Sequence, residues 1–115
     1  MLFRSHGLLG GIDGVALPLV APGNVHVFNQ YTLRAERRDA LKEHVAGQGI
    51  GSGVYYPVPL HLQACFAELG GKPGDLPVTE ALCQEVLSLP IFPELGEDRL
   101  ARVAEGIRSF YGVIA

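Results

Sequence analysis

The clearest pattern of alternating hydrophobic and polar residues lies at residues 25–34, VHVFNQYTLR, and predicts a β-strand. Its apolar face would carry Val25, Val27, Tyr31 and Leu33. Asn29 falls on the same face and is therefore predicted to be buried and hydrogen-bonded. The backbone is the more common partner for such an amide, and a ligand is the alternative.

Apolar residues at helical spacing predict helices over residues 37–47, residues 62–69, a segment starting at Pro77 and a segment starting at Glu97. The third would bury Val78, Leu82 and Val86, and the last would bury Leu100, Val103, Ala104, Ile107 and Tyr111. Two further strands are predicted, over residues 50–56 and 87–89, because prolines follow each of them.

This order of elements predicts an α/β (α+β) fold, in which helices pack on a small, mainly antiparallel sheet of about three strands. Residues 25–115 would form the domain. Residues 1–24 are predicted to be an irregular lead-in, because four glycines interrupt any helix, with a short extended piece at residues 15–20.

The length, composition and charge of the chain argue against several classes of function. The chain has 115 residues, 48% of them hydrophobic, which suits one small domain. Its net charge is −3 and no basic run is longer than Arg37-Arg38, so a nucleic-acid binder is not expected. No stretch approaches the ~20 apolar residues that span a bilayer, and the start is a poor signal peptide, which favours a cytoplasmic protein. Cys65 and Cys83 form no zinc set and are predicted to be buried, reduced thiols.

No catalytic set is apparent from the sequence. Lys42 lies on a charged helix face and Lys72 in a GGKPG loop, and neither has the apolar setting of a Schiff-base lysine. The glycine-rich run at residues 47–53 follows a helix and enters a strand, the reverse of a dinucleotide-binding fingerprint. We therefore expect no catalytic residue, no metal and no cofactor on this chain alone.

The segment VYYPVPLH, residues 54–61, is the most unusual in the chain. Two prolines restrict the backbone, so Tyr55, Tyr56 and His61 are presented in fixed positions. Two interpretations remain open. The polar tips bind hydroxyl or phosphate groups of a ligand, or one tyrosine faces the core, the other faces solvent and His61 caps the next helix. Arg34 at a strand end either holds an anion or, more commonly, pairs with a carboxylate such as Glu36.

Three blocks give the chain a family resemblance: HVFNQYTLR, then ERRDALKEHVAGQGIGSGVYYPVPLHLQ, then GDLPVTEALCQEVLSLPIFPEL. They resemble the carboxy-terminal part of the DegT/DnrJ/StrS family, which are pyridoxal-phosphate-dependent aminotransferases acting on nucleotide-linked keto-sugars. The match runs from Gly10 to Phe110, and Met1 to His6 do not resemble the family.

The resemblance implies a domain fragment. The large domain, with the cofactor lysine and phosphate-binding groups, is absent, and pyridoxal phosphate would belong to the full-length enzyme. This small domain would close one side of the active site. The positions that match substrate-side positions of the family are Tyr55, Tyr56, His61, Asn29 and Arg34.

Two functions follow as expectations. The first is a part of a sugar-nucleotide aminotransferase that contacts the nucleotide-linked keto-sugar and is inactive alone. The alternative is a stand-alone binding or regulatory module derived from this fold. The expected partners are the missing large domain and, through exposed apolar residues, other copies of the chain.

Overall fold

A three-stranded antiparallel sheet in the order β1-β2-β3 forms the centre of the protein in the computed structural model, which describes residues 2–113. The strands are β1 (Val15–Ala16), β2 (Tyr31–Ala35) and β3 (Val86–Leu89). Strand β2 lies between the other two, and its residues Tyr31 to Arg34 pair with Leu89 to Val86. The prediction of an α/β domain with a small antiparallel sheet of three strands is confirmed.

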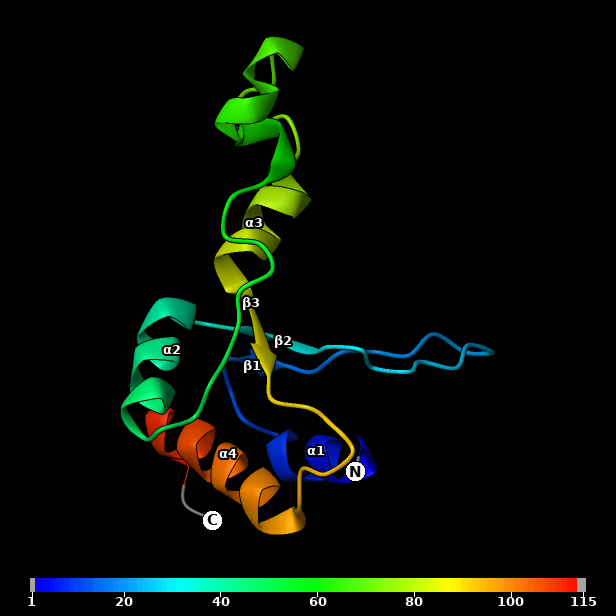
Figure 1. Cartoon of the computed structure of the whole chain (residues 1–115), viewed down its shortest axis with the longest axis vertical. Coiled ribbons are helices and arrows are strands. Elements are labelled where there is room, and N and C mark those ends of the chain that lie inside the picture. Colours follow the sequence, from blue (N-terminus) through cyan, green and yellow to red (C-terminus); the bar gives the residue numbers. More distant parts are fainter. Residues whose placement is uncertain (1, 114–115) are drawn as a thin grey trace.

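Four α-helices and two short 3-10 helices surround or extend this sheet (Figure 1). The α-helices are α1 (Leu2–Leu9), α2 (Arg38–Gly47), α3 (Pro77–Glu85) and α4 (Glu97–Phe110). The 3-10 helices are η1 (Leu60–Leu62) and η2 (Ala64–Leu69). The positions predicted for α2, α3, α4 and β3 are therefore confirmed.

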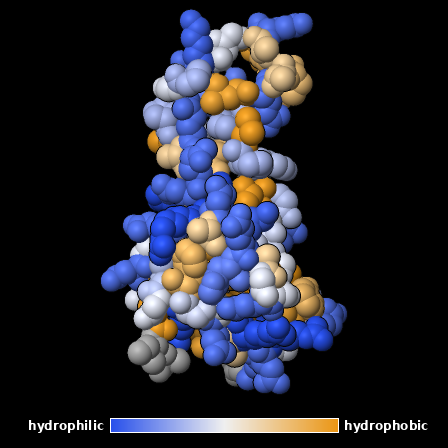
Figure 2. All heavy atoms as spheres, turned by 90° about the vertical axis from the view of Figure 1, so that its left-hand side faces the viewer, coloured by the Kyte–Doolittle hydropathy of each residue, from blue (hydrophilic) through white to orange (hydrophobic). Residues whose placement is uncertain are grey.

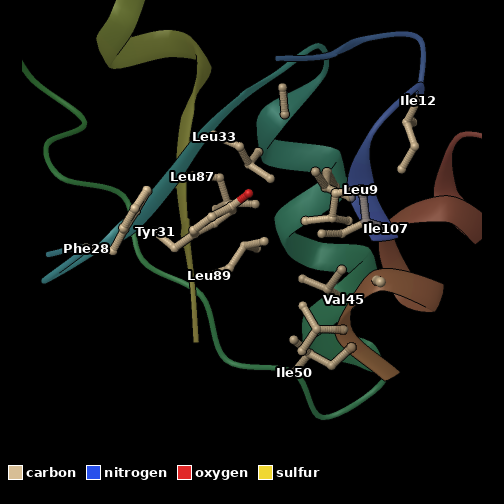
Figure 3. Packing of buried hydrophobic residues seen from close by; sticks show 14 residues of the cluster. Leu9, Ile12, Phe28, Tyr31, Leu33, Val45, Ile50, Leu87, Leu89 and Ile107 are labelled. Atoms are coloured by element: carbon tan, nitrogen blue, oxygen red, sulfur yellow. The ribbon is translucent and has the colours of Figure 1, made fainter. Parts of the chain in front are cut away.

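One face of the sheet packs on the helices because β2 alternates inward and outward. Tyr31, Leu33 and Ala35 point inward and are buried, while Thr32 and Arg34 lie on the opposite face. Figure 3 shows the inward side chains meeting residues of α1, α2 and α4, and the most deeply buried of these helix residues are Leu41, Val45 and Ile107. Helix α4 packs against both α1 and α2. We call the sheet with α1, α2 and α4 the body.

The prediction of an irregular segment over residues 1–24 is wrong for its first part. Residues Leu2–Leu9 form α1, although Gly7 lies inside it. A glycine in a helix costs only about 1 kcal/mol, and the segment buries Leu9 and Ile12 against the core. Tertiary packing of this segment thus outweighs the low helix propensity of its glycine. The short extended piece predicted over residues 15–20 is confirmed only at Val15–Ala16, which is β1, and residues 17–20 are not in a strand.

The predicted strand over residues 25–34 begins only at Tyr31. Residues 17–30 are neither helix nor strand, and they run out from the sheet and back as a loop that we call the finger (Figure 1). Val25 and Val27 lie on this finger and are 93% and 84% exposed, so their predicted burial is wrong. Alternation alone does not make a strand where no neighbouring strand pairs with it.

The predicted strand over residues 50–56 reduces to a single bridge, in which Gly53 exchanges two backbone hydrogen bonds with Ser88. From Val54 to Leu76 the chain then leaves the body as a second extension, the arm, which contains η1 and η2 and returns through α3 (Figure 1). The predicted helix over residues 62–69 is therefore a 3-10 helix on the arm.

Two burial predictions fail around the arm. Cys65 in η2 is exposed, so only Cys83 is a buried thiol as predicted. Val78 in α3 was predicted to be buried but is 72% exposed. The buried residue of α3 is Cys83, which lies on a different side of the helix. Figure 2 shows hydrophobic patches among hydrophilic atoms over this upper part of the molecule. Among residues 2–113, no helix is both long and apolar enough to cross a membrane.

Candidate functional site

A polar groove lies where the end of the finger, the start of the arm and β3 meet. Its volume is about 510 Å³, and it is open to solvent. The polar side chains that line it are Asn29, Gln30, Ser52, Tyr55 and Ser88. Two of the residues predicted to contact a substrate, Asn29 and Tyr55, are thus brought together from positions 26 apart in the sequence. Asn29 is exposed, so the prediction that it is buried is wrong.

A close contact with a glycine fixes the place of Tyr55 in this groove. The phenol ring lies directly over Gly53, where a Cβ atom would come within 2.8 Å of the ring. Because residue 53 is glycine, the ring can lie this close to the backbone, and a Cβ atom at that position would require the end of the Tyr55 side chain to shift. Gly53 is in turn held by its two hydrogen bonds to Ser88. The Tyr55 ring therefore lies on a backbone segment that is paired with β3, although the side chain itself is half exposed.

Ser88 in the groove lining forms a hydroxyl pair with Thr32 of β2, which lies outside the lining. Ser88 is buried on the sheet face opposite the core, and its hydroxyl lies 2.7 Å from that of Thr32 on β2. Thr32 and Ser88 lie opposite each other on neighbouring strands, and each hydroxyl has the other as its hydrogen-bond partner. Strand β3 thus contributes one hydroxyl, that of Ser88, to the lining of the groove beside the apolar Leu89.

The groove is chemically neutral. Its lining contains amides, hydroxyls, one phenol ring and the apolar residues Leu89, Pro90 and Ile91, and it contains no Asp, Glu, Lys, Arg or His. Such a surface can exchange hydrogen bonds with hydroxyl groups and can cover the apolar face of a ring with an aromatic side chain. It suits a neutral, hydroxyl-rich group better than a phosphate, which would call for cationic side chains or a helix N-terminus.

Tyr56 stands beside Tyr55 at the start of the arm. Their ring centroids are 5.9 Å apart in an edge-to-face arrangement. The two side chains are 50% and 66% exposed, so the expectation that one of them faces the core is wrong. Both phenol groups are available at the surface next to the groove.

His61 lies further along the arm and is engaged within the chain. Its Nε2 is 2.8 Å from Oε1 of Glu80 on α3, and its side chain is only 13% exposed. The pKa of the Glu80 carboxyl is lowered, chiefly by the backbone N–H of Gly74 and then by His61. In this arrangement His61 is part of the internal structure of the arm rather than of the groove.

Arg34 lies in a different, larger groove of about 670 Å³ between the sheet and the start of α2. It pairs with Glu85 at 2.7 Å, so the expectation of a carboxylate partner is confirmed, although the partner is Glu85 rather than Glu36. The two other arginines that line this larger groove also have partners within the chain. Arg38 is buried and donates hydrogen bonds to Asp39 and to two backbone carbonyls, while Arg37 lies over the ring of Phe110. The cations of this groove are therefore already engaged by the protein.

The residues present do not fit a covalent pyridoxal phosphate site. Lys42 on α2 and Lys72 on the arm are both exposed, and neither lines the grooves described above. A lysine that binds this cofactor needs a setting that favours its neutral amine. Among the described residues, no cluster of three or more His, Cys, Asp or Glu side chains could hold a metal ion.

Sequence reasoning missed four contributors to these sites, one of which is Gln30 in the groove lining. Ser52 and Ser88 line the groove, and Glu80 holds the arm. Ser88 stands between two leucines of a predicted buried strand, and a polar residue there is a usable signal. Glu80 follows Pro77 in the first turn of a predicted helix, a place where carboxylates commonly bind backbone N–H groups.

Comparison with known proteins adds a family match. A sequence model of the DegT/DnrJ/EryC1/StrS aminotransferase family matches residues 6–108. A curated relative from Geobacillus stearothermophilus, named pleiotropic regulatory protein, is 52% identical over 86% of this chain and 27% of its own length. The UDP-N-acetyl-3-dehydro-alpha-D-glucosamine 3-aminotransferase of Acidithiobacillus ferrooxidans is 45% identical over 87% of this chain and 26% of its own length.

A solved structure has a closely similar fold. The crystal structure of DesV from Streptomyces venezuelae, in complex with a ketimine intermediate, superposes with a TM-score of 0.92 at 35% identity. The match covers 98% of this chain and 30% of that one. The chain thus spans between a quarter and a third of the length of these relatives.

Proposed function

Because the chain belongs to the DegT/DnrJ/EryC1/StrS aminotransferase family, we propose that it is the substrate-side domain of a sugar-nucleotide aminotransferase. In this proposal the chain carries no catalytic residue of its own. It closes one side of an active site whose cofactor, pyridoxal phosphate, and cofactor lysine are held by a separate, larger domain. The chain alone transfers no amino group, because its two lysines are exposed.

The observation that carries the proposal is the neutral groove between the finger and the arm. Asn29, Ser52 and Tyr55 offer amide and hydroxyl groups at its surface. These groups match the hydroxyls of a sugar ring, and the tyrosine rings can lie against its carbon face. We assign the sugar part of a nucleotide-linked keto-sugar to this groove, with Tyr56 as a further contact. The phosphates would be bound by another part of the assembled enzyme.

The finger and the arm supply the surface for the larger domain. Their exposed apolar side chains include Leu19, Val25 and Val27 on the finger and Leu60, Phe66 and Leu69 on the arm. Exposed apolar groups gathered on two extensions are typical of an interaction surface. The large domain is the proposed occupant, since relatives of this chain have more than twice its length in additional residues.

The experiment that tests this function is reassembly. The chain is co-expressed with the remaining part of a relative such as the 52% identical protein, and amino transfer to nucleotide-linked keto-sugars is assayed. We expect activity only when both parts and the cofactor are present. Tyr55→Phe and Asn29→Ala should lower kcat/KM by about 5- to 150-fold, the effect of one lost hydrogen bond. Lys42→Ala, outside the groove, is the control.

Two results would contradict the proposal: amino transfer by the isolated chain, or a reassembled enzyme in which the groove variants behave like the control. A visible absorption band from pyridoxal phosphate bound stoichiometrically to the isolated chain, and lost in Lys42→Ala or Lys72→Ala, would also contradict it.

A second candidate function is a stand-alone binding or regulatory module. The observation that favours it is the name of the 52% identical relative, a pleiotropic regulatory protein. Binding of a nucleotide sugar by the isolated chain at micromolar concentration, with no dependence on a larger domain, would favour the module over the enzyme part.

A further inference from the structure

One side chain connects the arm to α3. Glu80 accepts a hydrogen bond from His61 Nε2 at 2.8 Å and from the backbone N–H of Leu76 at 3.3 Å. Its two oxygens also accept from the N–H of Gly74, at 2.9 and 3.0 Å. Two segments of the arm, η1 and the turn just before α3, thus converge on one carboxylate, which is more than a surface ion pair provides.

The same contact determines which nitrogen of His61 carries the proton. A carboxylate only accepts, so His61 Nε2 must be the donor and carry hydrogen. In the neutral form of the ring, Nδ1 is then the nitrogen without hydrogen. This atom is buried and has no hydrogen-bond partner among the described residues. With Nε2 occupied and Nδ1 buried, neither ring nitrogen of His61 can reach a ligand in this conformation.

The backbone of His61 is held as closely as its ring. Gly71 lies against the His61 carbonyl, where any Cβ would collide with that oxygen. On the other side, two prolines separate His61 from Tyr56, and Pro59 is buried. Because proline restricts the backbone, a fixed His61 restricts where the tyrosine pair at the mouth of the groove can stand.

We propose that Glu80 is a positioning residue that, together with His61, forms a clasp for the arm. The clasp holds His61 as the Nε2–H tautomer and fixes the position of Tyr55 and Tyr56 beside the groove. His61 therefore acts through this clasp and does not contact the substrate itself. The consequence for substrate binding rests on the proposed function, whereas the clasp is a property of this chain alone.

The first test is nuclear magnetic resonance of the isolated chain. We expect the ¹⁵N signals of the His61 ring to show the Nε2–H tautomer. In Glu80→Gln the carboxylate charge is lost but the shape is kept, and exchange of the Gly74 amide with solvent should accelerate about 10- to 100-fold. Glu68→Gln, an exposed glutamate on the same arm, is the matched control and should leave both signals unchanged. A Nδ1–H tautomer, or unchanged Gly74 exchange in Glu80→Gln, overturns the clasp.

The second measurement asks whether the clasp positions the tyrosine, which a purely local role would not do. The ring of Tyr55 lies over Gly53, so the Gly53 Hα signals should carry a ring-current shift. We expect this shift to shrink in Glu80→Gln and His61→Ala but not in Glu68→Gln. The amide of Val45 in the body monitors global folding. An unchanged Gly53 signal in both clasp variants overturns the positioning role.

The two proposals fail separately. In the reassembled enzyme, Glu80→Gln should raise KM for the nucleotide sugar several-fold with little change in kcat. If the clasp signals appear as expected but no groove variant alters substrate binding, the proposed function is wrong and the clasp stands. If groove variants impair substrate binding while Glu80→Gln and His61→Ala leave KM unchanged, the clasp has no role in binding.

Discussion

The body and the two extensions use the same apolar residue types in opposite ways. In the body, Leu41 and Val45 of α2 are completely buried between the sheet and α4. On the finger, Leu19 and Val25 are 92% and 93% exposed. The molecule is correspondingly elongated, with principal extents of 48, 36 and 25 Å, because the finger and the arm project from the body (Figure 1).

This contrast separates stability from recognition. Burial of apolar side chains stabilises the body at roughly 25 cal/mol per Å², whereas the exposed side chains of the finger and arm contribute little until a partner covers them. The groove lies at the junction of the two regions, where the rigid sheet supplies Ser88 and the extensions supply Asn29 and Tyr55. Recognition residues are thus placed on extensions that a stable body supports.

The largest expected effect is on the core of the body. Leu41→Ala removes a completely buried side chain and should lower the free energy of unfolding by about 2–5 kcal/mol. The matched variant Leu19→Ala, at an exposed leucine of the finger, should change it by less than about 0.5 kcal/mol. Urea unfolding monitored by circular dichroism measures both. Equal losses would mean that the finger shares in the core.

The next effect concerns the attachment of α3, which leads into the arm, to the body. Buried Arg38 donates to the carbonyls of Cys83 and Val86, at 2.9 and 2.8 Å, where α3 ends. Arg38→Met keeps the apolar stem but leaves these carbonyls without a donor, so we expect a loss of about 1–3 kcal/mol of unfolding free energy. Lys42→Met on the exposed side of α2 is the control, and a similar loss there would argue against this role.

A smaller effect is expected at alkaline pH. Burial raises the pKa of Tyr31 from 10.0 to about 12. The unfolded chain releases this proton near pH 10 and the folded chain only near pH 12, so stability is full below pH 10 and falls between these values. Tyr31→Phe should make the fall shallower, leaving the part due to Tyr111, whose pKa burial also raises. Melting temperatures between pH 9 and 12 measure this, and an unchanged slope would contradict it.

At neutral pH, Tyr31→Phe should lower the free energy of unfolding by about 1 kcal/mol. The Tyr31 hydroxyl donates to His6 Nδ1 at 3.1 Å, because His6 Nε2 donates to the carbonyl of Pro18. The hydroxyl therefore helps to hold α1 and the base of the finger to β2.

We expect the smallest effect on stability, together with a clear effect on self-association, from a substitution on the finger. Val25→Lys replaces a side chain that is 93% exposed and should change the unfolding free energy by no more than about 0.5 kcal/mol. The isolated chain should self-associate as its concentration rises, and Val25→Lys should weaken this. Light scattering across a concentration series measures it. A strict monomer at high concentration would count against an apolar docking surface.

Much of the fold could be predicted because local patterns and tertiary packing agree there. Helix α4 follows the spacing of Leu100, Val103 and Ile107, and all three are buried as expected. Helix α2 ends where Gly49 takes a positive φ of 76°, as its glycine stop signal indicates. The predictions failed where local pattern and tertiary contacts disagree. The alternating residues 25–30 have no strand beside them, whereas α1 forms despite Gly7 because its segment packs on the core.

The candidate site was predicted only in part. Tyr55 and Asn29 do meet at one groove, but Arg34 lies in another groove and His61 is bound to Glu80. Spacing along the chain identified residues with suitable chemistry, yet it contained no information on which of them would be close together.

The sequence by itself determined the class of fold, helices α2 and α4 of the body and the family, because these depend on apolar periodicity, turn residues and local motifs. Only the tertiary structure decided that residues 17–30 and 54–76 project from the body, that Tyr55 rests on Gly53, and that Glu80 joins two segments of the arm. The physical reason is that burial and hydrogen bonding are settled by contacts between distant segments. A valine or a histidine carries the same local preference whether or not another part of the chain comes to cover it.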